Sequence, residues 1–115
     1  MKIERWVDSN NQMCKLGDSL WSVARLIALS KELDVMEIPL THLHMYYTYE
    51  KLTLREFVTH MRAVNEADLR YPIILDEDGE IMDGRHRVMK ALLNKKESIK
   101  AVRFDVNPAP CRVDD

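Results

Sequence analysis

The sequence predicts an α+β fold in which helices pack on one small mixed sheet. Three observations lead to this prediction: stretches with helical patterns, a hairpin pattern between residues 71 and 83, and two further short β-type runs. The chain has 115 residues, enough for a single core, and its 46% hydrophobic residues are typical of a globular protein. We therefore expect one compact domain with the order helix, strand, helix, hairpin, helix, strand.

The first predicted helix spans residues 19–33. The first dozen residues carry no regular pattern, and Asp18 or Ser19 can cap the helix that follows them. Apolar residues nearly encircle this stretch, which is typical of a helix that is well buried or shared with a partner. We therefore expect helix 19–33 to lie in the core or to form a homo-oligomer interface.

A strand and a second helix are predicted next. Residues 35–40 form a short β-type run, and Pro39 places it at an edge or an end of the sheet. Residues 41–52 are ambiguous. Thr53 and Glu56 form a capping-box pattern, after which apolar residues recur at helical spacing to about residue 66. These apolar residues are Leu54, Phe57, Val58, Met61 and Val64.

A hairpin occupies the next part of the chain. The apolar run at residues 71–75 is followed by an acidic turn at 76–79, which ends in glycine. Residues 80–83 form the returning strand. The hairpin therefore ends directly before the next predicted helix.

The last predicted elements are a helix over residues 85–94 and a strand over 99–104. The helix is expected to bury Val88, Ala91 and Leu92. It is expected to present Arg87, Lys90 and Asn94 on its opposite side. Residues 107–110 contain two prolines and are predicted to end the regular structure.

The most informative feature for function is the pentapeptide Asp83-Gly84-Arg85-His86-Arg87, at the start of the last helix. A helix start offers unpaired N–H groups and the positive end of the helix dipole, both of which favour a phosphate. Arginine adds planar, bidentate recognition of oxygen atoms. The pattern therefore predicts a phosphate-bearing ligand.

Each member of the pentapeptide has a functional and a structural interpretation. Gly84 permits close approach of a phosphate or simply a sharp turn. Asp83 could hold Mg²⁺ or act as a base, but we rank helix N-capping ahead of chemistry. His86 could bind phosphate or transfer a proton, and Arg87 is the best phosphate contact unless it pairs with Asp83. Arg85 and Arg87 point in different directions, so one of them could miss the ligand.

Other candidate groups are weaker. Cys14 and Cys111 lie far apart in sequence and form no metal or redox motif, so we expect free thiols. His42 and His44 would share one side of a strand and could begin a metal site, although we favour a surface pair. Five aromatic residues could stack a base but are more often core or partner contacts. They are Trp6, Trp21, Tyr46, Tyr47 and Tyr49.

The charge pattern limits the classes of partner. The net charge is −2, but residues 85–103 carry seven Arg or Lys against one acid, Glu97. This gives a local positive field without a general attraction to nucleic acid. No apolar run approaches the length of a membrane span, and the N-terminus has no signal-peptide pattern, so we expect a cytoplasmic protein without membrane association.

The segment from Val35 to Phe104 resembles the ParB/sulfiredoxin superfamily. The resemblance lies in the order of an opening strand, Glu37-Ile38-Pro39-Leu40, a helix, the hairpin, the Gly-x-[His/Arg]-Arg core of the pentapeptide, and a closing strand at 99–102. By residue type, the pentapeptide is most similar to the Asp-Gly-His-His-Arg and Asp-Gly-Gln-His-Arg variants. The resemblance implies a ParB/sulfiredoxin-like domain over residues 35–105, with a helical extension at 1–34 and a tail at 106–115.

The resemblance also implies a ligand. The matching loop of that superfamily holds nucleotide phosphates, so we expect ATP or CTP with Mg²⁺, gripped by Gly84, Arg85, His86 and Arg87. A slow NTPase or small-molecule kinase would use Asp83 and His86. Arg85 replaces the sulfiredoxin cysteine, which disfavours that activity. The alternatives are a regulatory or assembly protein that retains only the fold, and a DNA-associated protein, although we do not expect specific DNA binding.

Overall fold

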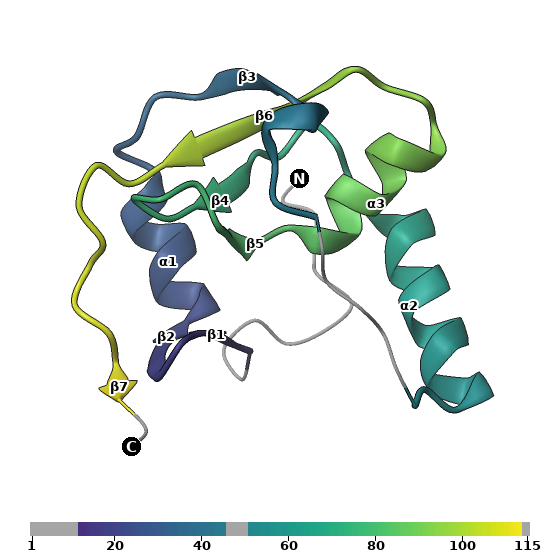
Figure 1. Cartoon of the computed structure of the whole chain (residues 1–115), viewed down its shortest axis with the longest axis horizontal. Coiled ribbons are helices and arrows are strands. Elements are labelled where there is room, and N and C mark those ends of the chain that lie inside the picture. The colour runs from purple at the N-terminus through teal and green to yellow at the C-terminus, as the bar shows by residue number, and fades with distance from the viewer. Residues whose placement is uncertain (1–11, 46–50, 114–115) are drawn as a thin grey trace.

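The larger of two sheets has four strands in the order β3-β6-β4-β5 (Figure 1). The computed structural model describes residues 12–45 and 51–113. Strand β6 pairs antiparallel with β3 and parallel with β4, and β4 pairs antiparallel with β5. The strands span Met36–Pro39 (β3), Ile73–Leu75 (β4), Ile81–Asp83 (β5) and Ser98–Arg103 (β6). The predicted α+β class with a mixed sheet is therefore confirmed.

Each face of this sheet carries its own hydrophobic core, because successive strand residues point to opposite faces. Ile73 and Leu75 enter one core, which α3 (Arg85–Leu93) covers with Val88 and Ala91. Ile74 enters the other core, which is covered by α1 (Val23–Ser30) and by a hairpin near the N-terminus. Figure 1 shows α2 (Leu54–Glu66) on the outer side of α3, away from the sheet. Helix α3 is thus held between the sheet and α2.

The expected helix over residues 19–33 is wrong in its first turn. Residues 19–22 form strand β2, which pairs antiparallel with β1 (Met13–Leu16), a strand that the sequence pattern did not indicate. Helix α1 begins only after Ser22, whose side chain accepts a hydrogen bond from the backbone N–H of Arg25. The pattern suggested a helix encircled by apolar residues because it included Leu20 and Trp21. These two residues belong to strand β2 and are buried there. Leu29 is 39% exposed on α1, and the homo-oligomer expected through this segment stays a prediction.

The C-terminal segment packs against β2, and the expectation that regular structure ends at residues 107–110 is also wrong. Strand β7 (Arg112–Val113) pairs antiparallel with β2 and completes a second, three-stranded sheet. The indole Nε1 of Trp21 donates to the carbonyl oxygen of Pro108 at 2.8 Å. These contacts bring the two ends of the described chain together.

The local signals in the middle of the chain are confirmed. Thr53 Oγ1 accepts a hydrogen bond from the N–H of Glu56, and the Glu56 carboxylate accepts one from the N–H of Thr53, which is the predicted capping box. In the β4–β5 turn, the buried carboxylate of Asp76 accepts from the N–H groups of Asp78 and Glu80. Both devices satisfy backbone donors that the elements themselves leave unpaired.

Two expectations for α3 are wrong. Leu92 is 48% exposed rather than buried, and Arg87 is 6% exposed rather than on the outer side. The reason is that the outer side of the first turns of α3 is covered by α2 and by the chain that leads into β4. None of the described helices has the length and apolar composition needed to cross a membrane.

Candidate functional site

The turn between β5 and α3 requires glycine at position 84. Gly84 is the N-cap residue of α3 and has a φ of +107°, a conformation that other residues rarely adopt. A Cβ atom at this position would lie 2.6 Å from Cγ2 and 3.2 Å from Cα of Ile73 on the neighbouring strand. The glycine therefore lets the start of α3 pack directly against β4.

Asp83 does not cap α3, contrary to our ranking of its roles. The N-cap position belongs to Gly84, which has no side chain to offer. The Asp83 carboxylate instead accepts a hydrogen bond from Nη2 of Arg87 at 3.1 Å, across one turn of the chain. Both side chains are about nine-tenths buried, at 10% and 7% exposure. The carboxylate is thus committed to a buried ion pair at the base of the site.

Arg87 is a structural anchor in this arrangement. Its Nη1 donates to the carbonyl oxygens of Pro72 at 2.5 Å and of Tyr71 at 3.4 Å, in addition to the bond with Asp83. One guanidinium thereby ties α3 to the chain entering β4 and to the end of β5. This geometry matches the structural interpretation of Arg87, pairing with Asp83, and leaves little of its surface for a ligand.

His86 faces a histidine that the sequence analysis did not consider. Its Nε2 lies 2.9 Å from Nδ1 of His60 on α2, and the two rings are tilted by 40° with centroids 5.1 Å apart. At this distance one ring donates a hydrogen bond and the other accepts it. His60 was missed because it lies 26 residues from His86 in the sequence. The available signal was its spacing on the predicted helix, four residues before the apolar residue Val64.

The electrostatic environment of His86 is mainly positive. Burial, the neighbouring His60 and the exposed guanidinium of Arg85 lower the pKa of His86, with a smaller lowering from Arg87. Only Asp83 acts in the opposite direction. The negative charge of Asp83 is largely balanced by Arg87. A bound anion near His86 would therefore add negative charge and favour the protonated ring.

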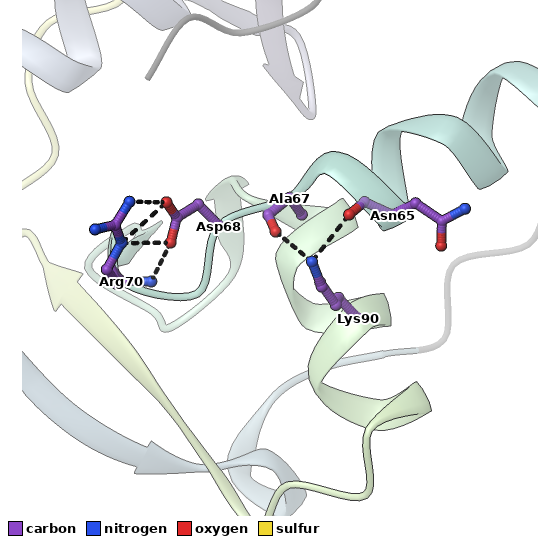
Figure 2. A network of polar contacts seen from close by, with 5 residues as sticks. All are labelled: Asn65, Ala67, Asp68, Arg70 and Lys90. Atoms are coloured by element: carbon purple, nitrogen blue, oxygen red, sulfur yellow. Dashed lines mark hydrogen bonds and ion pairs between the residues drawn. The ribbon is translucent and has the colours of Figure 1, made fainter. Parts of the chain in front are cut away.

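A cation from α3 holds α2 in the position that brings His60 to His86. Lys90 Nζ donates to the carbonyl oxygens of Asn65 and Ala67, at 2.9 and 2.7 Å, where α2 ends (Figure 2). A positive charge at this point satisfies unpaired carbonyls and complements the helix dipole. Just beyond it, Arg70 pairs with Asp68 and lowers the pKa of that carboxyl to about 2.

The other predicted candidates are not brought to this site. His42 lies in the 3₁₀ helix η1 (Leu40–His42) rather than on a strand, and His44 Nδ1 is bonded to the Glu80 carboxylate at 2.9 Å. Within residues 12–45 and 51–113, no group of three His, Cys, Asp or Glu residues could hold a metal ion. Trp21 is a core residue, and the other aromatic candidates, Trp6, Tyr46, Tyr47 and Tyr49, lie outside the described residues.

The two cysteines are free thiols, as expected, but in different environments. Cys14 is buried in the core beneath α1, and this burial raises its pKa to about 11. Cys111 is exposed, and its sulfur accepts hydrogen bonds from the N–H of Ser22 and from Arg25, which lower its pKa. Cys14 lies close enough to the start of α3 for the charges of Arg85 and Asp83 to act on its thiol, although burial is the larger effect.

The site therefore consists of the Gly84 turn, the Arg85 side chain and the His60–His86 pair, supported from below by the buried Asp83–Arg87 ion pair. Comparison of the chain with known protein families, with curated proteins and with solved structures finds no match.

Proposed function

We propose that the start of α3 binds the phosphate groups of a nucleoside triphosphate. The observation that carries the proposal is the His60–His86 pair, whose nitrogens lie 2.9 Å apart beside the exposed Arg85. An anion at this point would accept hydrogen bonds from charged donors, which are stronger than those between neutral groups. The first turn of α3 adds backbone N–H groups and the positive end of its dipole.

The pair offers a direct way to recognise negative charge. In its unliganded form one of the two facing nitrogens must carry no proton, because two donors at this distance would repel each other. The other ring nitrogen of His86, Nδ1, has no hydrogen-bond partner among the described residues. A bound phosphate would favour the protonated ring and give its N–H an acceptor.

ATP or CTP with Mg²⁺ is the proposed ligand because the order of elements from β3 to β6 and the pentapeptide resemble the ParB/sulfiredoxin superfamily. In this account Arg85, His86 and His60 contact phosphate, whereas Arg87 acts as a positioning residue that fixes the turn. The function proposed is binding. Asp83 already uses Oδ2 in its ion pair with Arg87, and the proposal assigns it no catalytic role as a metal ligand or base.

Calorimetric titration of the full chain tests this proposal. ATP, CTP and GTP, each with Mg²⁺, and inorganic tripolyphosphate are titrated at pH 6.5 into the wild type and the Arg85→Ala and His60→Gln variants. We expect binding of at least one nucleotide and of tripolyphosphate. Each variant should weaken it about tenfold, the loss of one charge-assisted hydrogen bond.

Lys96→Ala is the matched control because it removes one exposed positive charge from the same basic segment, beyond the end of α3. It should leave affinity nearly unchanged. Absence of heat for every ligand at millimolar concentration, or equal losses in Lys96→Ala and Arg85→Ala, would contradict the proposed site.

A further inference from the structure

Helix α2 exposes an apolar stripe on its N-terminal half. The stripe consists of residues spaced three and four apart, which places them on one side of the helix. The exposed fractions are 86% for Leu54, 53% for Phe57, 50% for Val58 and 50% for Met61. A contiguous patch of exposed apolar side chains marks an interaction surface, whereas isolated apolar residues on a surface are ordinary.

This stripe is separate from the phosphate site. Helix α2 contacts α3 through an adjoining side nearer its C-terminal end, where Ala63 and Val64 are buried and His60 contacts His86. Figure 1 places α2 at the outside of the molecule, beyond α3. The packing of α2 on α3 therefore leaves the stripe turned away from the core.

One border of the stripe is positively charged. Arg55 and Arg62 are seven residues apart, so they lie on the same flank of α2, and both are exposed. No ion pair joins either guanidinium to another residue in the described parts of the chain. Of the acids nearest in sequence, Glu56 is used by the capping box at Thr53, and Glu66, four residues after Arg62, is in no ion pair with it among the described residues. The surface is thus an apolar stripe with a cationic border, and no ion pair between described residues neutralises the two border charges.

We propose that the stripe binds an amphipathic helix of a partner protein whose apolar face is flanked by acidic residues. The spacing of the four apolar side chains suits helix-to-helix packing, and acidic flanks would pair with Arg55 and Arg62. A second copy of α2 fits less well, because antiparallel pairing of two stripes places the Arg55–Arg62 border of one copy along the same border of the other. An anionic membrane surface is also less suited, since lipid-binding clusters contain about four to eight basic residues.

The test uses two synthetic helical peptides and the full-length protein. Both peptides carry leucines at i, i+3, i+4 and i+7; one has glutamates on the flanks and the other lysines. Fluorescence anisotropy should show at least tenfold tighter binding of the glutamate peptide. The double substitution Arg55→Glu and Arg62→Glu should reverse this preference, and Phe57→Ser should abolish binding of both peptides. Because these side chains are exposed, we expect the circular dichroism spectra and the tripolyphosphate affinity to be unchanged.

Several outcomes would overturn the proposal. The first is failure of the glutamate peptide to bind. The second is equal affinity for the glutamate and lysine peptides. The third is a preference for the glutamate peptide that remains in the doubly substituted protein. Self-association in sedimentation that Phe57→Ser removes would identify a second copy as the occupant instead. Binding to phosphatidylserine vesicles without binding to the glutamate peptide would identify a membrane surface.

Discussion

Arg87→Ala is expected to destabilise the fold by about 3 kcal/mol or more, the usual consequence of removing one partner of a buried ion pair. The substitution leaves the carboxylate of Asp83, which is 10% exposed, without its positive partner. It also removes the donor to the carbonyls of Tyr71 and Pro72. Urea denaturation followed by circular dichroism measures the effect as a lower midpoint.

The exposed ion pair between Arg70 and Asp68 provides the control. Arg70 binds Asp68 through several hydrogen bonds, but its side chain is 77% exposed. Exposed pairs contribute little to stability because water already solvates both charges. Arg70→Ala should therefore leave the urea midpoint nearly unchanged, and equal effects of the two substitutions would contradict the anchoring role of Arg87.

Gly84→Ala has the second large expected effect, about 3 kcal/mol, from strain of the left-handed backbone together with overpacking against Ile73. The added methyl group would lie 2.6 Å from Cγ2 of Ile73, and the strand backbone at 3.2 Å cannot give way easily. For a chain of this size the thermal midpoint should fall on the order of 10 °C. Differential scanning calorimetry of the variant gives this value directly.

Gly79→Ala separates the two causes. Gly79 also has a positive φ, +85°, but no atom lies within 4 Å of the position its Cβ would take. It therefore measures backbone strain alone, and we expect a fall in the midpoint less than half as large. If the two variants were equally destabilised, close packing of the turn on β4 would not be the reason for glycine at position 84.

Local patterns in the sequence predicted the middle of the fold well. The capping box at Thr53, the acidic turn after β4 and the glycine before α3 each act through neighbours a few residues away. Interactions of this kind depend on the sequence at that point and little on the rest of the chain. They were sufficient to place α2, the β4–β5 hairpin and α3.

The remaining features depend on contacts between distant segments. The stretch at residues 19–22 is a strand because it lies between β1 and β7, which no helical periodicity could reveal. Arg87 is buried where carbonyls of Tyr71 and Pro72, 16 and 15 residues away, accept its hydrogen bonds. His60 joins the site only because α2 packs on α3.

The apolar stripe of α2 illustrates a related limit. Its spacing correctly predicted a helix, but of the predicted apolar residues only Val64 is buried, and Ala63 and His60 complete the contact with α3. A hydrophobic periodicity identifies a helix without stating what covers its apolar face. Leu54, Phe57, Val58 and Met61 therefore point to a partner rather than to the core.

The lowered pKa of His86 makes the stability of the fold depend on pH. Because the folded state disfavours protonation of His86, this neutral side chain contributes stability above the unfolded pKa of about 6.5. That contribution is lost as the pH falls from there through the depressed folded pKa. A bound phosphate should oppose the loss, because it favours the protonated ring and so raises the pKa.

Nuclear magnetic resonance titration of the four histidine rings tests for a phosphate site at the start of α3. The rings are followed between pH 5 and pH 8, with and without millimolar inorganic tripolyphosphate. Phosphate binding predicts that the curves of His60 and His86 move to higher pH, while those of His42 and of His44, which is bonded to Glu80 instead, change less. Curves of His60 and His86 that superimpose with and without tripolyphosphate would contradict a phosphate site at the start of α3.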